Sequence, residues 1–505
     1  MGDLSDFNEL SEIQTFYKDT TILLTGCTGF LGKILLEKLL RACEVKKIYC
    51  IVRDKKNQLA DERFHQMFES KMFDNVKNKY SNLKEKVCVI SGDCLMENLG
   101  LNEKDRNFLV ENIEVIFHVA ATIRFNRKLK AAIQINVKTT KYLLDMAKEM
   151  KQLKALIYTS SAYSNCDKEV IHEVIYKNRI SVHKFLTFIE DFDEDFVNKV
   201  TPNVLGKLPN TYVFTKALAE ELLLDYGKLE CKLPIVIVRP SILSSAYKEP
   251  LPGWIDSWFT IGSISAAGSY GLLRSANSDP DKLADIVPTD YAANCLIASG
   301  IKAKEWNMKE FELPIFNFVT SVESPITWGD YTKKCFQMGM NYAPIRCCRY
   351  PCVKLTRHKI IHKIRAFYMH HLPAHICDVV LYVFGSKFSV RFFYKLLHNF
   401  LDETSYFSTR QWKFCNDNVQ KLWNGLSPLD QQLFHFSMKD FDWDDYILEF
   451  LRNGRVYLLQ DSMETLPQAR RRLKVLKIIH YIIIILEYAF LLWIDYLILC
   501  YFNFL

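Results

Sequence analysis

The stretch TILLTGCTGFLG, residues 21–32, decides the fold. An apolar run typical of a buried strand leads into three glycines, Gly26, Gly29 and Gly32, and helical spacing follows. In a strand–turn–helix unit the first glycine allows the tight turn, the second lets the backbone approach a pyrophosphate, and the third lets the helix pack closely on the strand. The start of such a helix attracts anions through its unpaired N–H groups. We therefore expect a dinucleotide to contact Thr25, Gly26, Thr28, Gly29, Phe30, Leu31 and Gly32.

Further buried strands follow at intervals along the first half of the chain. Between them lie segments such as residues 32–40 and 133–150, in which apolar side chains recur every three or four positions. Strands that alternate with amphipathic helices predict a parallel sheet covered on both faces. The expected fold class is α/β, a Rossmann-like doubly wound parallel sheet. Its predicted strands are residues 21–24, 47–52, 87–91, 115–119, 155–159 and 235–238.

The residues at the carboxyl ends of these strands are candidates for cofactor binding, because open parallel sheets bind ligands at that edge. The second strand ends in Arg53, followed by Asp54. An arginine accommodates a ribose 2′-phosphate, so Arg53 favours NADPH. The alternative is a solvated Arg53, with Asp54 binding the 2′-hydroxyl of NADH. Asp93 ends the third strand, where it can accept from the adenine amino group, and Ala120 follows the fourth, where it leaves room for the dinucleotide.

A tyrosine and a lysine four positions apart, Tyr212 and Lys216, indicate a catalytic pair. On a helix this spacing puts both side chains on one face. An ammonium near a phenol lowers the phenol pKa, and a tuned phenol can protonate the carbonyl oxygen as hydride arrives at the carbon. Ser161, after the fifth strand, can hydrogen-bond the same oxygen, with Ser160 as the fallback. Arg239 closes the next strand and is expected to contact a phosphate or to pair with a carboxylate.

The last part of the chain differs in kind from the rest. Residues 475–505 are nearly continuous apolar sequence, preceded by Arg470, Arg471, Arg472 and Lys474. A helix of that length exceeds the thickness of the hydrocarbon core, and the preceding cations predict that the rest of the chain faces the cytosol. The alternatives are a buried core helix, for which Glu487 and Asp495 argue, and a helix or hairpin lying in one leaflet.

The composition of the chain limits the classes of function and the domain organisation that we expect. The net charge of +7 on 505 residues is too small to indicate nucleic-acid binding. The polar N-terminus carries no secretory signal, so the cysteines are expected as thiols in a reducing compartment. We expect a reductase domain over residues 15–340, with irregular substrate-facing insertions at 241–340, a helical domain over 345–465, and a membrane anchor over 475–505.

One helical stretch is both basic and aromatic. Residues 345–377 carry seven Lys or Arg and no acid, which indicates a solvated face, a membrane-surface contact or attraction of phosphates. The aromatic run at 379–384 and 392–394 is typical of helical core or of the wall of an acyl tunnel. Cys348, Cys352, His358 and His362 are too closely spaced for a zinc finger, so no metal is expected.

Several motifs together resemble the fatty acyl-CoA reductases, a branch of the extended short-chain dehydrogenase/reductase superfamily. They are LLTGCTGFLGK, IYCIVRDK, HVAATIRFN, YTSSAY, YVFTKALAE and VRPSIL, with Tyr406-Phe407, Arg410-Gln411-Trp412 and Asp442-Trp443 in the helical region. The resemblance covers roughly residues 15–460. Cys27 stands where the family usually has alanine, and Ser161 stands where it usually has threonine. A serine hydroxyl can serve the same role as the threonine hydroxyl.

The resemblance implies that two NADPH reduce a long-chain acyl-CoA to a primary alcohol through a thiohemiacetal and an aldehyde, with release of CoA. It implies that Lys216 also holds the nicotinamide ribose and that Asn136 anchors a water in the proton relay. The implied location is an endoplasmic-reticulum or peroxisomal membrane, with a single pass near the C-terminus. The rival hypotheses are a membrane-bound reductase of a sterol-like ketone or alcohol and a catalytically inactive dinucleotide-binding scaffold; an oligomeric state is not readable.

Overall fold

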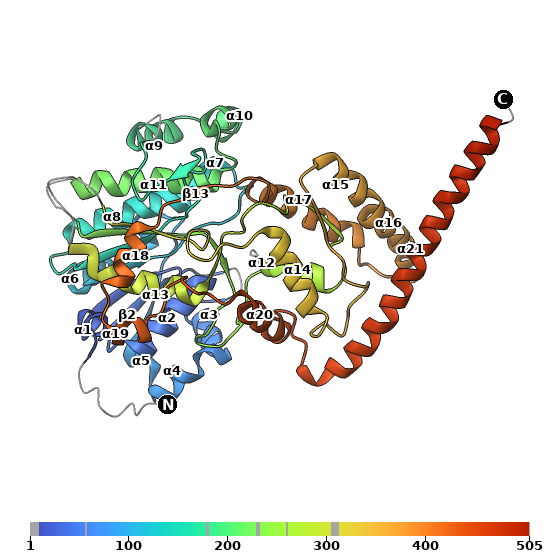
Figure 1. Cartoon of the computed structure of the whole chain (residues 1–505). Coiled ribbons are helices and arrows are strands. Elements are labelled where there is room, and N and C mark those ends of the chain that lie inside the picture. The colour runs from blue at the N-terminus through green and yellow to red at the C-terminus, as the bar shows by residue number, and fades with distance from the viewer. Residues whose placement is uncertain are drawn as a thin grey trace. The chain divides into compact units, whose positions relative to one another are not determined.

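The computed structural model describes residues 10–55, 58–177, 181–228, 233–258, 261–304 and 313–503 (Figure 1). The chain forms two compact units, each assembled from separate stretches. Unit 1 comprises Met1–Ile255, Leu283–Ile326 and Arg410–Asp442, and unit 2 comprises Asp256–Lys282, Thr327–Thr409 and Trp443–Leu505. The contiguous domain boundaries expected from the sequence therefore differ from these units.

Unit 1 is built on a seven-stranded, all-parallel sheet in the order β11-β7-β5-β4-β1-β2-β3. The six strands predicted from the sequence are all present, and a seventh strand, β11, was not predicted. The strand order reverses between β1 and β4, which places a ligand-binding crevice at their carboxyl ends. The strands are β1 (Thr21–Thr25), β2 (Lys47–Val52), β3 (Val87–Ser91), β4 (Val115–His118), β5 (Ala155–Thr159), β7 (Ile235–Pro240) and β11 (Ile315–Phe318).

Helices cover both faces of the sheet, as Figure 1 shows, with α8 and α11 on one face and α2 and α13 on the other. Every residue of β1 and β5 is buried, because each of these central strands has a helix layer on either side. The doubly wound fold is therefore confirmed. The helices of unit 1 are α1 (Glu12–Tyr17), α2 (Phe30–Ala42), α3 (Ala60–Phe68), α4 (Asp74–Lys79), α5 (Leu83–Lys86), α6 (Glu103–Asn112), α7 (Leu129–Ile133), α8 (Thr139–Glu149), α9 (Val182–Asp191), α10 (Glu194–Leu205), α11 (Thr211–Lys228), α13 (Thr289–Ser299), α18 (Asp417–Asn424) and α19 (Pro428–Leu433).

The described part of residues 241–340, the segment expected to be irregular, contains regular helices and strands between its loops. β8 (Ile242–Ser244) pairs with β10 (Ile286–Pro288), and α13 is buried along its whole length. The small residues Ala292 and Ala293 let α13 pack closely, and the glycines and prolines that suggested irregularity lie mostly in the turns. The expectation of irregular structure rested on these glycines and prolines and overlooked the apolar runs between them.

Residues 410–442 belong to unit 1 because they complete one edge of it. β13 (Lys413–Phe414) pairs with β6 (Val170–Ile171), and the indole N–H of Trp412 donates to the Cys166 carbonyl at 2.9 Å. The side-chain amide of Asn317, on β11, donates to the Cys415 carbonyl at 2.8 Å. These hydrogen bonds explain why the stretch packs as part of unit 1.

Unit 2 is mainly helical, with one short parallel ladder between β9 (Ser275–Asn277) and β12 (Lys354–Thr356). Its apolar centre joins Leu273, Tyr394, Leu397 and Leu401. The run at 379–384 is not helical core, since Val379, Tyr382 and Phe384 are exposed. The helices are α12 (Ile261–Ser269), α14 (Trp328–Gly339), α15 (Lys359–Ala366), a π-helical turn (Phe367–His371), α16 (Leu372–Val383), α17 (Val390–Ser408), α20 (Trp443–Tyr457) and α21 (Leu466–Asn503).

The C-terminal helix α21 confirms the predicted apolar segment and begins earlier than expected, at Leu466. Over the described residues it is the one helix long and apolar enough to cross a membrane, by length and composition, and its apolar stretch is not buried. Its base is packed: Leu473 is buried and Arg472 donates to the Cys347 carbonyl at 2.9 Å. Within the described residues this apolar stretch is therefore not a buried core helix.

Candidate active site

The turn after β1 has the geometry that only glycine permits. Gly26 has φ +78°, and a Cβ added to it would lie 2.7 Å from the Ala120 nitrogen. A Cβ on Gly32 would lie 2.1 Å from the Gly26 carbonyl oxygen, so the first turn of α2 lies directly against the loop. The loop is thus a cradle of bare backbone at the crevice where the strand order reverses.

The N-terminus of α2 faces this cradle without a side-chain cap. Gly29 is the N-cap residue, and its own N–H donates to the Gly26 carbonyl at 2.9 Å. The N–H groups of the following residues have no intrahelical acceptor, which leaves them for an anion. Phe30 stacks on Trp254 with ring centroids 5.5 Å apart, and Leu31 is buried. A dinucleotide pyrophosphate fits this arrangement of donors.

A buried hydrogen-bond chain ties the glycine turn to the neighbouring strand. Ala120 N–H donates to Thr25 Oγ1 at 3.3 Å, Thr25 Oγ1 lies 2.8 Å from His118 Nδ1, and His118 Nε2 lies 3.1 Å from Thr140 Oγ1. Thr140 donates its proton to the Asn136 carbonyl at 2.8 Å, so it accepts from His118, and the imidazole carries its proton on Nε2. Burial, with a lesser effect of the Lys216 charge, lowers the pKa of His118 to about 3, which keeps this ring neutral. Thr25 therefore fixes the loop rather than offering a free hydroxyl.

Asn136 lies in a π-helical turn, Gln134–Lys138, between α7 and α8. Its amide oxygen accepts from Thr122 N–H at 2.9 Å, and its amide nitrogen donates to Thr215 Oγ1 at 2.9 Å. The side chain thus joins α11 to the loop after β4. π-helical turns of this kind occur frequently at functional sites.

The end of β2 presents two arginines. Arg53 is exposed, and Arg63, from α3, donates to the Arg53 carbonyl. Burial and the neighbouring Arg53 charge lower the pKa of Arg63, as expected for two guanidinium groups close together. The Asp54 carboxylate instead accepts from Ala60 N–H at 2.7 Å, at the start of α3. Sequence reasoning missed Arg63, because a loop separates it from Arg53 by ten positions.

Asp93 and Ala120 lie at the carboxyl ends of β3 and β4, as predicted. Asp93 N–H donates to the Leu99 carbonyl at 2.7 Å, and one carboxylate oxygen accepts from Leu95 N–H at 3.0 Å. These bonds shape the turn after β3 and hold the carboxylate in place. Both residues lie at the same edge of the sheet as the glycine turn.

Helix α11 carries Tyr212 and Lys216 on one face. Asn210 caps its start, accepting from Val213 N–H at 3.1 Å. Lys216 is buried, and its ammonium donates to the Thr159 carbonyl at 2.6 Å and to the Tyr158 hydroxyl at 3.2 Å. Burial lowers the pKa of Lys216 to about 7, against a smaller opposing effect of Glu220.

The surroundings of the Tyr212 phenol favour its protonated form. Burial raises its pKa to about 12, and a hydrogen bond with Ser161 offsets part of that rise. The sequence predicted that the Lys216 ammonium would lower this pKa. That prediction was wrong, because burial raises the phenol pKa and the Lys216 amine is bonded to β5 instead. A protonated phenol paired with a serine can donate to an oxyanion.

The two serines after β5 have different surroundings. Ser161 lies beside Tyr212, and its hydroxyl oxygen accepts from Tyr163 N–H at 3.2 Å. Ser160 instead donates to the Glu220 carboxylate at 2.5 Å. The structure therefore places Ser161 with the phenol and Ser160 in a separate network.

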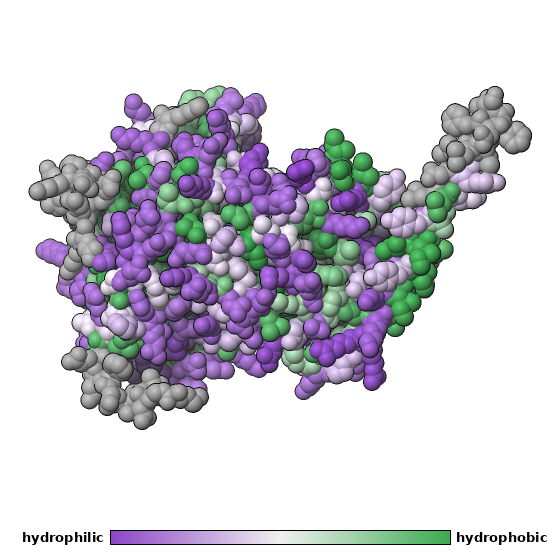
Figure 2. Space-filling model, in the orientation of Figure 1, coloured by the Kyte–Doolittle hydropathy of each residue, from purple (hydrophilic) through white to green (hydrophobic). Residues whose placement is uncertain are grey.

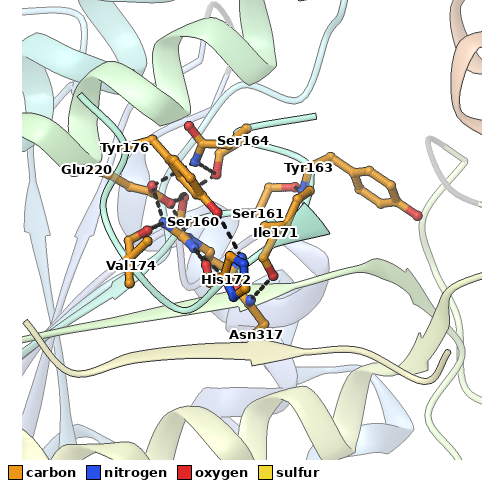
Figure 3. A network of polar contacts seen from close by, with 12 residues as sticks. Ser160, Ser161, Tyr163, Ser164, Ile171, His172, Val174, Tyr176, Glu220 and Asn317 are labelled. Atoms are coloured by element: carbon orange, nitrogen blue, oxygen red, sulfur yellow. Dashed lines mark hydrogen bonds and ion pairs between the residues drawn. The ribbon is translucent and has the colours of Figure 1, made fainter. Parts of the chain in front are cut away.

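That network is centred on Glu220, one helical turn after Lys216 and buried (Figure 3). Its two carboxylate oxygens accept from Arg239 Nε at 2.8 Å and Nη2 at 2.7 Å. Arg239 also donates to the carbonyls of His172 and Val174, at 3.0 and 2.8 Å. Of the two expectations for Arg239, the structure shows the pairing with a carboxylate, and its donors are all directed into this buried network. The pair instead locks α11 to β7 and to the loop after β5.

Among the described residues no group of His, Cys, Asp and Glu could hold a metal ion. His362, one of the spaced cysteines and histidines, hydrogen-bonds the Ser275 hydroxyl at 3.0 Å. The cysteines that the structure describes, such as Cys27 and Cys347, are free thiols.

The chain is similar to known proteins over most of its length. The family model described as "Male sterility protein" matches residues 24–296, and a second model of the same description matches residues 369–461. The chain is 36% identical over 500 residues to fatty acyl-CoA reductase wat of Drosophila melanogaster, covering 98% of this chain and 95% of that protein. It is 34% identical to fatty acyl-CoA reductase 1 of Mus musculus, over 93% and 90% of the two chains.

The chain belongs to the fatty acyl-CoA reductases. As a member of that family it is an NAD(P)H-dependent oxidoreductase. Solved structures show the same fold: the terminal R domain of the myxalamid biosynthetic pathway has a TM-score of 0.57 at 19% identity, covering 87% of this chain and 91% of that one. UDP-glucuronic acid 4-epimerase from Bacillus cereus, solved with NAD, has a TM-score of 0.50 at 14% identity, over 88% and 99%.

Proposed function

We propose that this fatty acyl-CoA reductase uses two NADPH to reduce a long-chain acyl-CoA to a primary alcohol, through a thiohemiacetal and an aldehyde, with release of CoA. The observation that carries the proposal is the placement of Ser161 beside Tyr212, on a helix that also buries Lys216. All three residues belong to the unit that holds the glycine cradle. The family membership supplies the acyl-CoA substrate class.

The choice of NADPH rests on the end of β2. Two guanidinium groups gathered there suit a 2′-phosphate, which arginine binds with charge-assisted hydrogen bonds. The rival residue for NADH, Asp54, is engaged by Ala60 N–H. The backbone of residues 26–32 would hold the pyrophosphate, and Lys216 the nicotinamide ribose.

When bound, the cofactor supplies hydride to the carbonyl carbon. Tyr212 donates its proton to the carbonyl oxygen while Ser161 holds that oxygen beside the phenol. The thiohemiacetal then loses CoA as the thiol and leaves an aldehyde. In the second round Tyr212 protonates the aldehyde oxygen and the alcohol forms. Each round consumes one hydride and one proton, so the overall reaction takes up two of each.

We further propose that α21 anchors the protein in a cytosol-facing membrane, of the endoplasmic reticulum or the peroxisome, as a single pass with the catalytic units in the cytosol. The length and hydropathy of α21 and the cations at 470–474 support this. A membrane location suits an enzyme whose product, a long-chain alcohol, partitions into lipid.

The test is an assay of membranes that contain the full chain, with acyl-CoAs of graded length, either NADPH or NADH, and product identification by mass spectrometry. Fatty alcohol formed with NADPH is the expected result. Tyr212→Phe should lower the rate by about 10²–10⁴-fold, the usual contribution of a general acid. Tyr176→Phe is the matched control, because that hydroxyl accepts from His172 N–H in the neighbouring network. Absence of alcohol and aldehyde, or reduction of a sterol-like ketone instead, would overturn the proposal.

A further inference from the structure

An exposed apolar hairpin tip stands out on unit 2. The tip consists of Tyr382, Val383, Phe384 and Phe388, at the turn between α16 and α17. Val383 is 75% exposed, Phe384 82% and Phe388 65%. Figure 2 shows apolar groups over the region of α15–α17 and again along α21. Contiguous apolar surface of this kind marks an interaction site.

The tip is held in place by a built turn. Gly385, with φ +73°, ends α16: its N–H donates to the Tyr382 carbonyl at 3.0 Å, and Ser386 N–H donates to the Leu381 carbonyl at 2.9 Å. Asp378 closes the hairpin from within, accepting from Val390 N–H at 2.6 Å and pairing with Arg391 at 2.8 Å. The exposure of the aromatic rings is therefore a fixed feature of the hairpin.

The helices beside the tip add more apolar surface and a surplus of positive charge. Ile360 is 74% exposed, and Phe367, Val379 and Phe392 are exposed as well. The exposed cations Lys359, Lys363, Lys387 and Lys395 lie among them. Between residues 345 and 401 the sequence has ten Lys or Arg and one acid, Asp378, which is already paired. Apolar side chains rimmed by cations are the pattern of a surface that binds anionic lipid.

Helix α21 is joined to the same unit near these helices. His480 stacks on Tyr350 with centroids 5.4 Å apart, and its Nδ1 lies 3.4 Å from Arg274 Nη2. The backbone N–H of Arg274 donates to His370 Nε2 at 2.9 Å, in the π-helical turn between α15 and α16. The apolar helix and the hairpin are thus tied together through Arg274.

We propose that the α16–α17 tip inserts into the surface of the bilayer that α21 enters, and that the surrounding lysines bind its anionic phospholipid headgroups. The inference rests on the proposed membrane attachment of α21 and adds a second, peripheral contact. Unit 2 is then held to the lipid at two points, and one of them depends on lipid charge.

The experiment uses the full chain in vesicles whose lipids carry a photoreactive diazirine in the acyl chain. After irradiation, adducts are mapped on peptides by mass spectrometry. Phosphatidylcholine vesicles are compared with vesicles in which about a third of the lipid is phosphatidylserine, an anionic lipid that attracts such lysines. Adducts are expected on α21 and on the peptide spanning residues 382–388, with more tip adducts when phosphatidylserine is present.

In the double variant Phe384→Asp/Phe388→Asp, the yield of adducts on the tip peptide should fall about tenfold or more. Burial of a single aromatic side chain in lipid is enough to shift the insertion equilibrium of the tip by that factor. Phe192→Asp is the matched control, an exposed aromatic of unit 1 that should change nothing. Activity on acyl-CoA in detergent, unchanged in the double variant, shows that it is folded. Adducts on α21 alone would overturn the inference and leave the anchor intact. Tip adducts equal in both vesicle types would overturn the part played by the lysines, and adducts on neither segment would overturn the inference and the anchor together.

Discussion

Replacing Lys216 with methionine should abolish catalysis and stabilise the fold of the cofactor-free protein. Lys216 is buried, bonded to neutral groups, and has its pKa lowered to about 7 by burial. An unfolded lysine titrates near 10.4, and each unit of difference corresponds to about 1.36 kcal/mol. At pH 7 the folded state therefore carries a cost of roughly 4 kcal/mol at this position.

Methionine removes that cost but also removes two hydrogen bonds and leaves the Thr159 carbonyl with fewer donors, which costs about 1–3 kcal/mol. The expected net gain is about 1–3 kcal/mol at pH 7, a rise of several degrees in Tm. The direction in which the stability changes with pH follows from the difference in bound protons between the unfolded and folded states. Because the folded pKa of Lys216 is lowered, the unfolded state binds more protons between about pH 7 and 10, and wild-type stability rises with pH across that window. The advantage of Lys216→Met should therefore shrink toward pH 10.

Thermal unfolding at pH 7, 8.5 and 10, followed by fluorescence or calorimetry, measures this difference. Lys38→Met is the matched control, since Lys38 is equally buried but pairs with Glu249 at 2.7 Å. Removing it leaves Glu249 with Arg41 alone and should lower the stability by about 1–3 kcal/mol. If Lys216→Met lowers Tm at pH 7 as Lys38→Met does, or if its advantage is the same at every pH, the reasoning about a buried, costly amine is refuted.

Three further predictions concern the site. Arg53→Ala should raise KM for NADPH by about 10–100-fold and leave KM for NADH nearly unchanged, measured by steady-state kinetics; equal effects on both would contradict the 2′-phosphate assignment. Ser161→Ala should lower kcat by about 10²-fold or more, whereas Ser160→Ala should lower Tm and retain kcat, so the reverse pattern would exchange their roles. Gly32→Ala should prevent dinucleotide binding in a fluorescence titration, because its Cβ would lie 2.1 Å from the Gly26 oxygen; normal affinity would show that the loop can relax.

The sequence predicted the parts of the fold that depend on local pattern. The strand–turn–helix unit at 21–32 and five more strands followed from apolar runs and glycine spacing. β11, residues 315–318, was missed, although the run Ile315-Phe316-Asn317-Phe318 between polar segments was the signal that could have found it. It was passed over because the surrounding prolines and glycines were weighed as marks of irregular structure.

The site was predicted in its chemistry better than in its electrostatics. Ser161, Tyr212 and Lys216 lie together, but spacing gave no measure of burial, so the direction of the Tyr212 pKa was wrong. Glu220 was missed although it follows Lys216 by four positions, one turn along the same helix. Its signal was Arg239, a buried arginine at a strand end, which requires a carboxylate partner. No local pattern could have shown which acid that was.

Unit 1 is assembled from separate stretches of the chain, so it is not complete until its last stretch has been synthesised. A ribosome releases β1 to β11 well before residues 410–442 emerge. Until then the edge strand β6, the Cys166 carbonyl and the Asn317 amide lack the partners that β13 and its neighbours supply. During synthesis the reductase unit therefore has an open edge until residues 410–442 emerge. A chain cut between residues 326 and 410 would keep every proposed catalytic side chain and still lack the piece that closes the unit around them.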